Sequence, residues 1–259
     1  MPEFLRVSLV QTELTWQNPE ANRAHFATLL QGLAGQTDLI VLPEMFTTGF
    51  MMTPETHAEA YGGASFTWLQ AQAAKVQAAI CGSIATAVEG RYTNRFMFVT
   101  PDGEVQFYDK RHLFRMGDEV NHYSAGFERK TFNYQGFRIL PQVCYDLRFP
   151  VFMRNRNDYD LAIVVANWPA VRRQPWRTLL QARAIENQSY VLGVNRVGTD
   201  GLGLVYSGDS LAVDFKGELL VDQLEGTAFV ETTLLDLNAL KQFREQFPAW
   251  MDADEFSLS

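Results

Sequence analysis

The sequence predicts a mixed α/β domain built in layers, and three features lead to this prediction. Short apolar runs recur along the chain, amphipathic segments separate some of them, and tight-turn signals interrupt the alternation. Several apolar runs are nearly continuous, as expected of strands covered on both faces. The chain has 259 residues and no linker-like stretch. We therefore expect one domain over 1–259, with a core at about 4–235 and a C-terminal extension at about 236–259.

The expected strands follow from the apolar runs. In chain order they are 5–12, 38–44, 78–86, 95–100, 104–110, 137–146, 160–167, 189–197, 210–215 and 227–234. The sequences PDGE at 101–104 and FKGE at 215–218 are tight-turn signals between strands. We expect a hairpin at each of these turns.

Three segments predict helices. Asn18 and Pro19 offer an N-cap followed by a first-turn proline. Apolar residues then recur at the i, i+3, i+4, i+7 spacing of a helix, at Phe26, Leu29, Leu30 and Leu33. The segments 65–78 and 174–188 have a similar amphipathic pattern.

Composition argues against several classes of function. The 22 basic and 30 acidic residues give a formal charge of −8, and no Lys/Arg cluster offsets it. Nucleic acid and anionic membranes are therefore poor partners, and the longest apolar runs are too short to span a bilayer. The four histidines have no zinc-like spacing with a cysteine or with one another. We expect no metal and no cofactor.

The cellular location is predicted from the N-terminus and the cysteines. The stretch 1–14 enters a strand pattern directly, without the basic and apolar regions of a signal peptide. Cys81 and Cys144 allow at most one disulfide, and in a cytoplasmic protein they are better interpreted as free thiols. We expect a cytoplasmic protein.

Three expected strands end in, or just before, a residue with reactive chemistry: Glu44, Lys110 and Cys144. Loops at strand ends converge in open α/β sheets, so these side chains are candidates for one site. A thiol can be the nucleophile, a carboxylate can accept its proton, and an ammonium can stabilise an oxyanion. Each also has a structural interpretation: an inert thiol, as for Cys81, a solvated lysine, or a carboxylate paired with arginine. The residues alone leave both interpretations open.

The segments around these residues resemble the three signatures of the nitrilase, or carbon–nitrogen hydrolase, superfamily. They are LIVLPEMF with Glu44, FYDKRHLF with Lys110 and PQVCYDLRFP with Cys144, in the family's order. VANWP at 165–169 and the segment 179–198 resemble further family segments. The resemblance spans about residues 5 to 235 and implies a four-layer α-β-β-α sandwich.

The resemblance also implies a mechanism with Glu44, Lys110 and Cys144 as a catalytic triad. The thiol of Cys144 would pass its proton to Glu44 and attack an amide carbon. Lys110 and the backbone N–H of Tyr145 would hold the oxyanion. Glu44 would return the proton to the departing ammonia and then activate the water that hydrolyses the thioester.

Glu119 is a candidate fourth residue of the site. Many family members carry a second glutamate near the lysine, and Glu119, upstream of Gly126, matches that place. It would orient Lys110 or the attacking water. Asp118 stands next to it, so a surface acidic pair is an equally open interpretation.

The residues after the cysteine distinguish branches of the superfamily. Nitrilases proper and aliphatic amidases usually continue Cys-Trp-Glu, whereas this chain reads CYDLRFP at 144–150. Together with VLPEMFTTGF, YDKRHLFRMGDE, NWP and FPAWMDADEF, this pattern resembles bacterial omega-amidases. These hydrolyse the terminal amide of 2-oxoglutaramate and 2-oxosuccinamate, for instance in methionine salvage. The alternatives are a hydrolase of N-carbamoyl compounds or another small amide, or an inactive scaffold relative.

A dicarboxylic monoamide requires a cation for its distal carboxylate. Arginines in segments near the expected site are Arg115, Arg148, Arg172, Arg173 and Arg196, and the sequence does not choose among them. Our candidates for substrate binding are Arg115, Arg148 and Arg173, with Phe50 and Trp168 as candidate pocket walls. Arg148 has a structural interpretation as a partner of Asp146, and the Arg172–Arg173 pair as solvated surface.

The resemblance implies a homodimer, because family members pair through a face of the sandwich. The aromatic-rich segments 149–155 and 247–256 are candidate contacts. The expected partners are therefore a small keto-acid amide substrate and a second copy of the chain, with no nucleic acid and no membrane.

Overall fold

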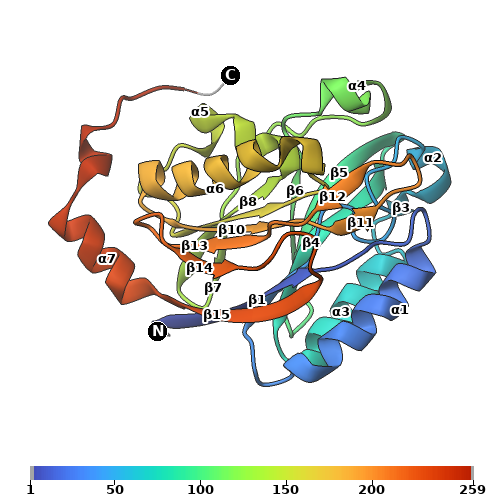
Figure 1. Cartoon of the computed structure of the whole chain (residues 1–259), viewed down its shortest axis with the longest axis horizontal. Coiled ribbons are helices and arrows are strands. Elements are labelled where there is room, and N and C mark those ends of the chain that lie inside the picture. Colours follow the sequence, from blue (N-terminus) through green and yellow to red (C-terminus); the bar gives the residue numbers. More distant parts are fainter. Residues whose placement is uncertain (1–2, 258–259) are drawn as a thin grey trace.

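The computed structural model describes residues 3–257 and stacks two β-sheets between two layers of helices (Figure 1). The order of layers is helix, sheet, sheet, helix, as predicted. Residues 1–2 and 258–259, which close the expected domain at its ends, lie outside the described residues.

The first sheet has seven strands, in the order β15-β1-β2-β4-β5-β6 with β3 beside β4. Strands β1, β2 and β4 are parallel, and β15, β5 and β6 are antiparallel to their neighbours. Their bounds are β1 Phe4–Gln11, β2 Leu39–Val41, β3 Glu59–Ala60, β4 Ala79–Val88, β5 Arg91–Val99, β6 Val105–Asp109 and β15 Phe229–Asp236.

The second sheet has six strands, in the order β14-β13-β10-β9-β8-β7, with β8, β9 and β10 parallel. Its strands are β7 Phe132–Tyr134, β8 Phe137–Val143, β9 Leu161–Val165, β10 Tyr190–Val194, β13 Leu211–Val213 and β14 Leu219–Asp222. A separate ribbon pairs β11 Val197–Thr199 with β12 Val205–Ser207.

Figure 1 shows α1 and α3 on the outer side of the first sheet and α5 and α6 over the second sheet. The helices are α1 Pro19–Leu30, α2 Pro54–His57, α3 Ala64–Val76, α4 Glu119–His122, α5 Pro150–Met153, α6 Arg173–Asn187 and α7 Leu237–Gln246. Short 3-10 turns are η1 Gln31–Leu33, η2 Arg115–Gly117, η3 Cys144–Arg148, η4 Ala170–Arg172 and η5 Ala249–Asp252. Asn18 caps α1 through its side chain, as predicted.

The strands of the first sheet are apolar on both faces because both faces are covered. Along β2, Leu39 and Val41 belong to the core between the sheets, whereas Ile40 packs with residues of α1 and α3. Cys81 of β4 is fully buried in the core between the sheets, where burial raises the pKa of its thiol. Cys81 therefore has the inert, structural interpretation.

The predicted strands are present, with differences at their ends. The hairpins β5–β6 and β13–β14 lie at the predicted turns. β2 ends at Val41, so Glu44 lies in the following turn and not in the strand, and the run 189–197 breaks after Val194. The short strands β3, β7 and β12 were not predicted, and β14 was expected only as the second strand of its hairpin, without bounds. Pairing with a neighbour defines these strands more than apolar patterning does.

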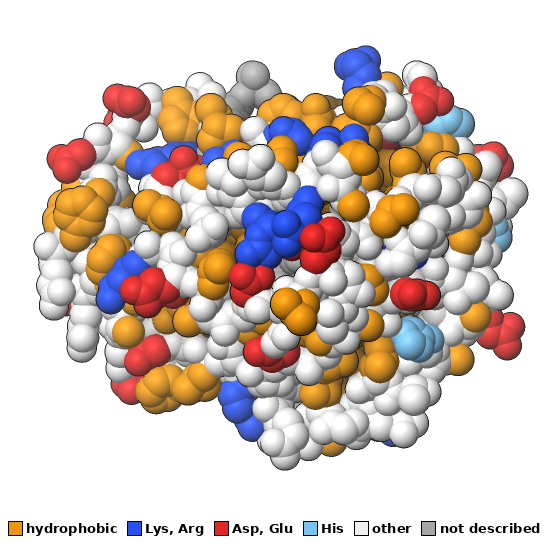
Figure 2. All heavy atoms as spheres, viewed as in Figure 1, with side chains coloured by type: hydrophobic (Ala, Val, Ile, Leu, Met, Phe, Trp, Pro, Cys, Tyr) orange, Lys and Arg blue, Asp and Glu red, His pale blue; other side chains and the backbone are white. Residues whose placement is uncertain are grey.

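The surface carries both basic and acidic side chains, as the 22 basic and 30 acidic residues lead one to expect. On the face shown in Figure 2, the basic side chains near the centre are bordered by acidic ones. No helix within residues 3–257 is long and apolar enough to cross a membrane.

Candidate active site

The fold brings Glu44, Lys110 and Cys144 together from three different strands. Glu44 lies in the turn after β2, Lys110 directly follows β6, and Cys144 begins η3 directly after β8. Because β2 and β6 belong to the first sheet and β8 to the second, the site lies where the ends of both sheets meet.

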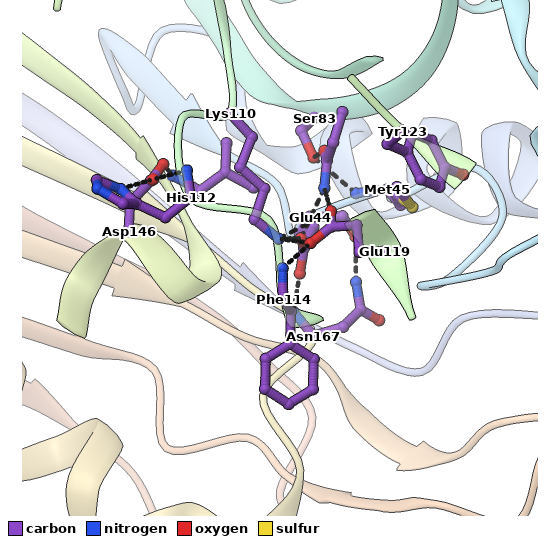
Figure 3. Close-up of polar contacts among 12 residues, drawn as sticks. Glu44, Met45, Ser83, Lys110, His112, Phe114, Glu119, Tyr123, Asp146 and Asn167 are labelled. Carbon is purple, nitrogen blue, oxygen red and sulfur yellow. Dashed lines mark hydrogen bonds and ion pairs between the residues drawn. The ribbon is translucent and has the colours of Figure 1, made fainter. Parts of the chain in front are cut away.

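Glu44, Lys110 and Glu119 form a fully buried ionic cluster (Figure 3). The Nζ of Lys110 lies 3.1 Å from Oε1 of Glu44 and 3.0 and 2.8 Å from the two carboxylate oxygens of Glu119. Glu119 also accepts the backbone N–H of Phe114 at 2.6 Å. Glu119 is thus buried beside the lysine, and the surface interpretation is wrong.

The turn that carries Glu44 is held from two sides. Met45 has a φ of 40°, a left-handed conformation that L-residues seldom adopt, and its N–H donates to Ser83 Oγ at 2.9 Å. Asn167 donates its backbone N–H to Oε2 of Glu44 at 2.7 Å and its side-chain amide to the Glu44 carbonyl. These bonds fix both the backbone and the carboxylate of Glu44.

Burial and charge set the protonation of the site. Burial acts to lower the pKa of Lys110, but the charges of Glu119 and Glu44 outweigh it and raise that pKa, so the ammonium stays charged. Burial raises the pKa of Glu119, with Lys110 opposing. Burial and the charge of Glu44 raise the pKa of the Cys144 thiol. A resting thiol of this kind needs a base at the moment of reaction.

Asp146 locks the loop that carries Cys144. Cys144 itself has a left-handed φ of 47°. The buried carboxylate of Asp146 accepts hydrogen bonds from the Val143 N–H at 3.0 Å, from Tyr108 OH at 2.9 Å, and from the His112 backbone N–H at 2.9 Å. His112 Nδ1 lies 2.7 Å from the same carboxylate. The cysteine loop is thereby tied to the segment that carries Lys110, and the alternative in which Arg148 is a structural partner of Asp146 is wrong.

Cys144 opens onto a cavity of about 110 Å³, and its exposed fraction is 9%. Five aromatic residues are among those that line the cavity: Phe50, Phe114, Tyr145, Trp168 and Tyr206. Such a cavity suits a small molecule with an apolar body, because drug-sized ligands need several hundred Å³.

Two guanidinium groups line the same cavity. Arg148 lies 4.9 Å above the ring of Trp168, and Arg172 lies 5.3 Å above the ring of Phe114. Within residues 3–257 neither has a carboxylate within ion-pair distance. Cation–π contacts hold both groups in place and leave their hydrogen-bond donors for an anion.

The other candidate arginines lie elsewhere. Arg115 is exposed on η2 and does not line the cavity, and Arg173 does not line it either, because its guanidinium pairs with Asp209 at 2.8 Å. Arg196 is fully buried and donates to backbone carbonyls. Arg172 ends η4 and Arg173 begins α6, so the two neighbours project differently. The sequence analysis singled out Arg173, but it is Arg172 that lines the cavity.

Several polar residues of the site were not singled out from the sequence: Ser83, Asn94, His112 and Asn167. Asn94 precedes the expected strand 95–100, and only the structure places it inside the buried part of β5. Asn167 lies in the family segment VANWP, of which only Trp168 was considered. Within residues 3–257, no cluster of three His, Cys, Asp or Glu side chains has metal-site geometry.

Comparisons with known proteins identify the family of this chain. The family model for carbon-nitrogen hydrolases matches residues 6–245. Omega-amidase YafV of Escherichia coli K12 is 51% identical, covering 98% of each chain, and the 2-oxoglutaramate amidase of Bacillus subtilis is 30% identical, covering 95% of this chain and 96% of that one. The crystal structure of XC1258 from Xanthomonas campestris, a CN-hydrolase superfamily protein with an arsenic adduct in its active site, has a TM-score of 0.97, 48% identity and full coverage of both chains. The protein belongs to the carbon–nitrogen hydrolase family.

Proposed function

We propose that this protein is an omega-amidase that hydrolyses the terminal amide of 2-oxoglutaramate and 2-oxosuccinamate to the 2-oxo dicarboxylic acid and ammonia. One observation carries the proposal. A thiol stands at the wall of a small cavity, with a buried Glu–Lys–Glu cluster behind it and two guanidiniums beside it that pair with no carboxylate of residues 3–257. The similarity to proteins named omega-amidase and 2-oxoglutaramate amidase supports the same assignment.

The first half-reaction forms a thioester on Cys144. The thiol gives its proton to Glu44, and the sulfur attacks the amide carbon. Lys110 Nζ and the backbone N–H of Tyr145 stabilise the oxyanion. When Glu44 becomes neutral, its attraction for Lys110 weakens, which leaves an N–H of the ammonium for the oxyanion. Glu44 then protonates the nitrogen, and ammonia departs.

The second half-reaction reverses these roles with water as the nucleophile. Glu44, again a carboxylate, takes a proton from water, and the hydroxide attacks the thioester carbon. Lys110 and Tyr145 again hold the oxyanion, and the thiolate of Cys144 leaves and is reprotonated. Glu119 keeps Lys110 oriented throughout, because it bonds Nζ through both of its oxygens.

Substrate choice depends on the cavity wall. Arg148 and Arg172 bind the distal carboxylate, and the rings of Trp168, Phe50 and Phe114 enclose the short carbon chain. Glutamine carries an ammonium where the keto acid carries a carbonyl, and the two guanidiniums repel that ammonium. The keto-acid amide is therefore preferred over the amino acid.

The assembly and location are part of the proposal. A homodimer is supported by exposed apolar side chains in the two candidate contact segments, namely Val151, Phe247 and Met251. Light scattering should then give twice the chain mass of 29.4 kDa, and a monomer at all concentrations would contradict it. Both cysteines are free thiols, in keeping with a cytoplasmic enzyme acting on the amide left when glutamine donates its amino group, as in methionine salvage.

The activity is tested by ammonia release from 2-oxoglutaramate, with glutamine, N-carbamoyl amino acids and a simple nitrile as comparison substrates. We expect turnover of the keto-acid amide that exceeds the others by about 10²-fold or more and is lost in Cys144→Ala. Cys144-dependent turnover of only a carbamoyl compound or nitrile would overturn the substrate assignment. Silence on every substrate would favour the inactive scaffold relative.

The cation assignment is tested by Arg148→Met and Arg172→Met. We expect each to raise KM for 2-oxoglutaramate about 10- to 100-fold with a smaller change in kcat. Arg173→Met is the matched control, because it removes the neighbouring guanidinium outside the cavity. Equal effects of all three variants would contradict the assignment.

A further inference from the structure

Asn94 is a buried asparagine on β5 that contacts both carboxylates of the site. Its Nδ2 lies 2.7 Å from Oε1 of Glu44 and 3.4 Å from Oε1 of Glu119. The side chain is fully buried. A buried amide that donates to two carboxylates at once is placed to control which of their oxygens remain free.

Ser83 fixes the direction in which the Asn94 amide points. The Ser83 hydroxyl accepts the Met45 N–H at 2.9 Å and donates its own proton to Oδ1 of Asn94 at 2.8 Å. Since Oδ1 is held by this donor, the NH₂ group of Asn94 must face the carboxylates. Met45 directly follows Glu44, so the bonds form a closed ring from the Glu44 turn through Ser83 and Asn94 back to the Glu44 carboxylate.

The hydrogen bonds divide unequally between the two oxygens of Glu44. Oε1 accepts from Asn94 and from Lys110, at 2.7 and 3.1 Å. Oε2 accepts the backbone N–H of Asn167 at 2.7 Å. A carboxylate offers about four lone-pair positions, two on each oxygen. Oε1 is therefore filled and Oε2 keeps one free position.

We propose that Asn94, oriented by Ser83, is a positioning residue that occupies Oε1 of Glu44 and directs the proton of Cys144 to Oε2. In this step the S–H bond of Cys144 breaks, an O–H bond forms at Oε2, and one negative charge moves from the carboxylate to the sulfur. The inference rests on the proposed role of Glu44 as the base.

The position of this proton matters because Glu119 is a second possible acceptor. A proton at Oε1 would lie beside Asn94 and Lys110, which also contact Glu119. The titratable groups around Glu44 are Lys110, Glu119, Cys144, Tyr123 and Tyr206. Of these, only Glu119 could retain the proton as a carboxylic acid. With Oε1 filled by N–H donors, the proton of Cys144 goes to Oε2 of Glu44, and Glu44 returns it from there.

The test combines Asn94→Ala and Ser83→Ala with Ser8→Ala as the control. Ser8 is a buried serine of the same sheet whose hydroxyl pairs with Thr232, and it is not among the described residues that line the cavity. Two readouts are measured against pH: kcat and KM for 2-oxoglutaramate, and the rate of Cys144 alkylation by iodoacetamide. The alkylation rate does not depend on the substrate assignment, so it tests the inference even if the proposed function fails.

For Asn94→Ala we expect kcat to fall about 10- to 100-fold with KM within about twofold. The acidic limb of both profiles should move up by about half a pH unit or more, because losing a donor disfavours the ionised carboxylate. Ser83→Ala should move the limb in the same direction and lower kcat about three- to tenfold, and Ser8→Ala should match the wild type.

A purely structural role would lower thermal stability and activity together without moving either pH profile, and that result would overturn the inference. If Asn94→Ala does not fold, Ser83→Ala decides the question alone. An unshifted alkylation profile in Ser83→Ala would then overturn it.

Discussion

Two ionic clusters built around buried carboxylates have opposite composition. The site cluster places two carboxylates, Glu44 and Glu119, around one ammonium, Lys110. The distal cluster places one carboxylate, Asp160, between two guanidiniums, with Arg138 at 2.7 Å and Arg244 at 2.9 Å. Both clusters bury carboxylates almost completely, so burial alone does not distinguish their roles.

The sign of the surplus charge separates the two clusters. Burial raises the pKa of Glu119, and Lys110 only partly opposes it. Burial also acts to raise the pKa of Asp160, but the hydrogen bonds from Arg138 outweigh it and hold that pKa below its usual value. A surplus carboxylate makes a cluster a proton acceptor, whereas surplus guanidinium keeps the carboxylate ionised.

The hydrogen bonds of the distal cluster to backbone carbonyls also indicate a structural role. Arg244 of α7 also donates to the carbonyls of Gln188 and Tyr159, and Arg138 bonds Asp160 just before β9. The distal cluster thereby fastens α7 to the second sheet, and none of its three residues is among the described residues that line the cavity at Cys144. We therefore assign the distal cluster a structural role and the site cluster a catalytic one. The following predictions test this difference.

Lys110→Met should have the largest effect, because it leaves two buried carboxylates without a cation. We expect kcat with 2-oxoglutaramate to fall by about 10³-fold or more and the free energy of unfolding to fall by about 3–5 kcal/mol. Steady-state kinetics and urea unfolding measure the two losses. Retention of a tenth of the wild-type kcat would contradict the role of the ammonium.

Glu119→Gln should lower kcat by about 10- to 100-fold, since Lys110 loses one ionic partner but keeps Glu44. The charge of Glu119 contributes to raising the pKa of the Cys144 thiol. Removing that charge should therefore move the pH profile of Cys144 alkylation to lower pH, opposite to the shift expected for Asn94→Ala. Asp118→Asn, which removes the exposed neighbouring charge, is the control. Equal profiles for Glu119→Gln and wild type would contradict the coupling.

Arg244→Met should affect stability and leave catalysis unchanged. Losing hydrogen bonds from a buried guanidinium to Asp160 and two carbonyls should lower the free energy of unfolding by about 2–3 kcal/mol. We expect kcat to stay within about twofold of wild type. A loss of kcat larger than that, at a temperature where the variant is folded, would erase the distinction between the clusters.

The smallest expected effect is the pH dependence of the free energy of unfolding that Arg244→Met removes. A lowered pKa at Asp160 contributes stability above its unfolded value near 3.8, and this contribution disappears as pH falls through the folded value. Arg244→Met weakens the depression, so the stability gap between variant and wild type should shrink by on the order of 1 kcal/mol between pH 6 and pH 3. Urea unfolding at both pH values measures it, and a constant gap would assign the effect of Arg244 to packing.

Part of the site was predictable because its residues lie in contiguous signatures. Glu44, Lys110 and Cys144 each stand beside an apolar strand, and the wide separations do not matter once the fold brings the strand ends together. Glu119 was predicted as a candidate, but its burial could not be, since the adjacent Asp118 has the same local pattern. Asn94 and Asp146 act through partners distant in the chain, and no local signal announces those bonds.

The sequence by itself determined the layered α/β class, the two hairpins and the identities of the reactive residues, because apolar period and short motifs are local properties of the chain. Only the tertiary structure decided that Arg172 and Arg148 line the cavity while Arg173 turns to Asp209, and that the amide of Asn94 faces Glu44. The direction of a side chain depends on the contacts that the folded neighbours leave open, and spacing along the chain does not encode those contacts.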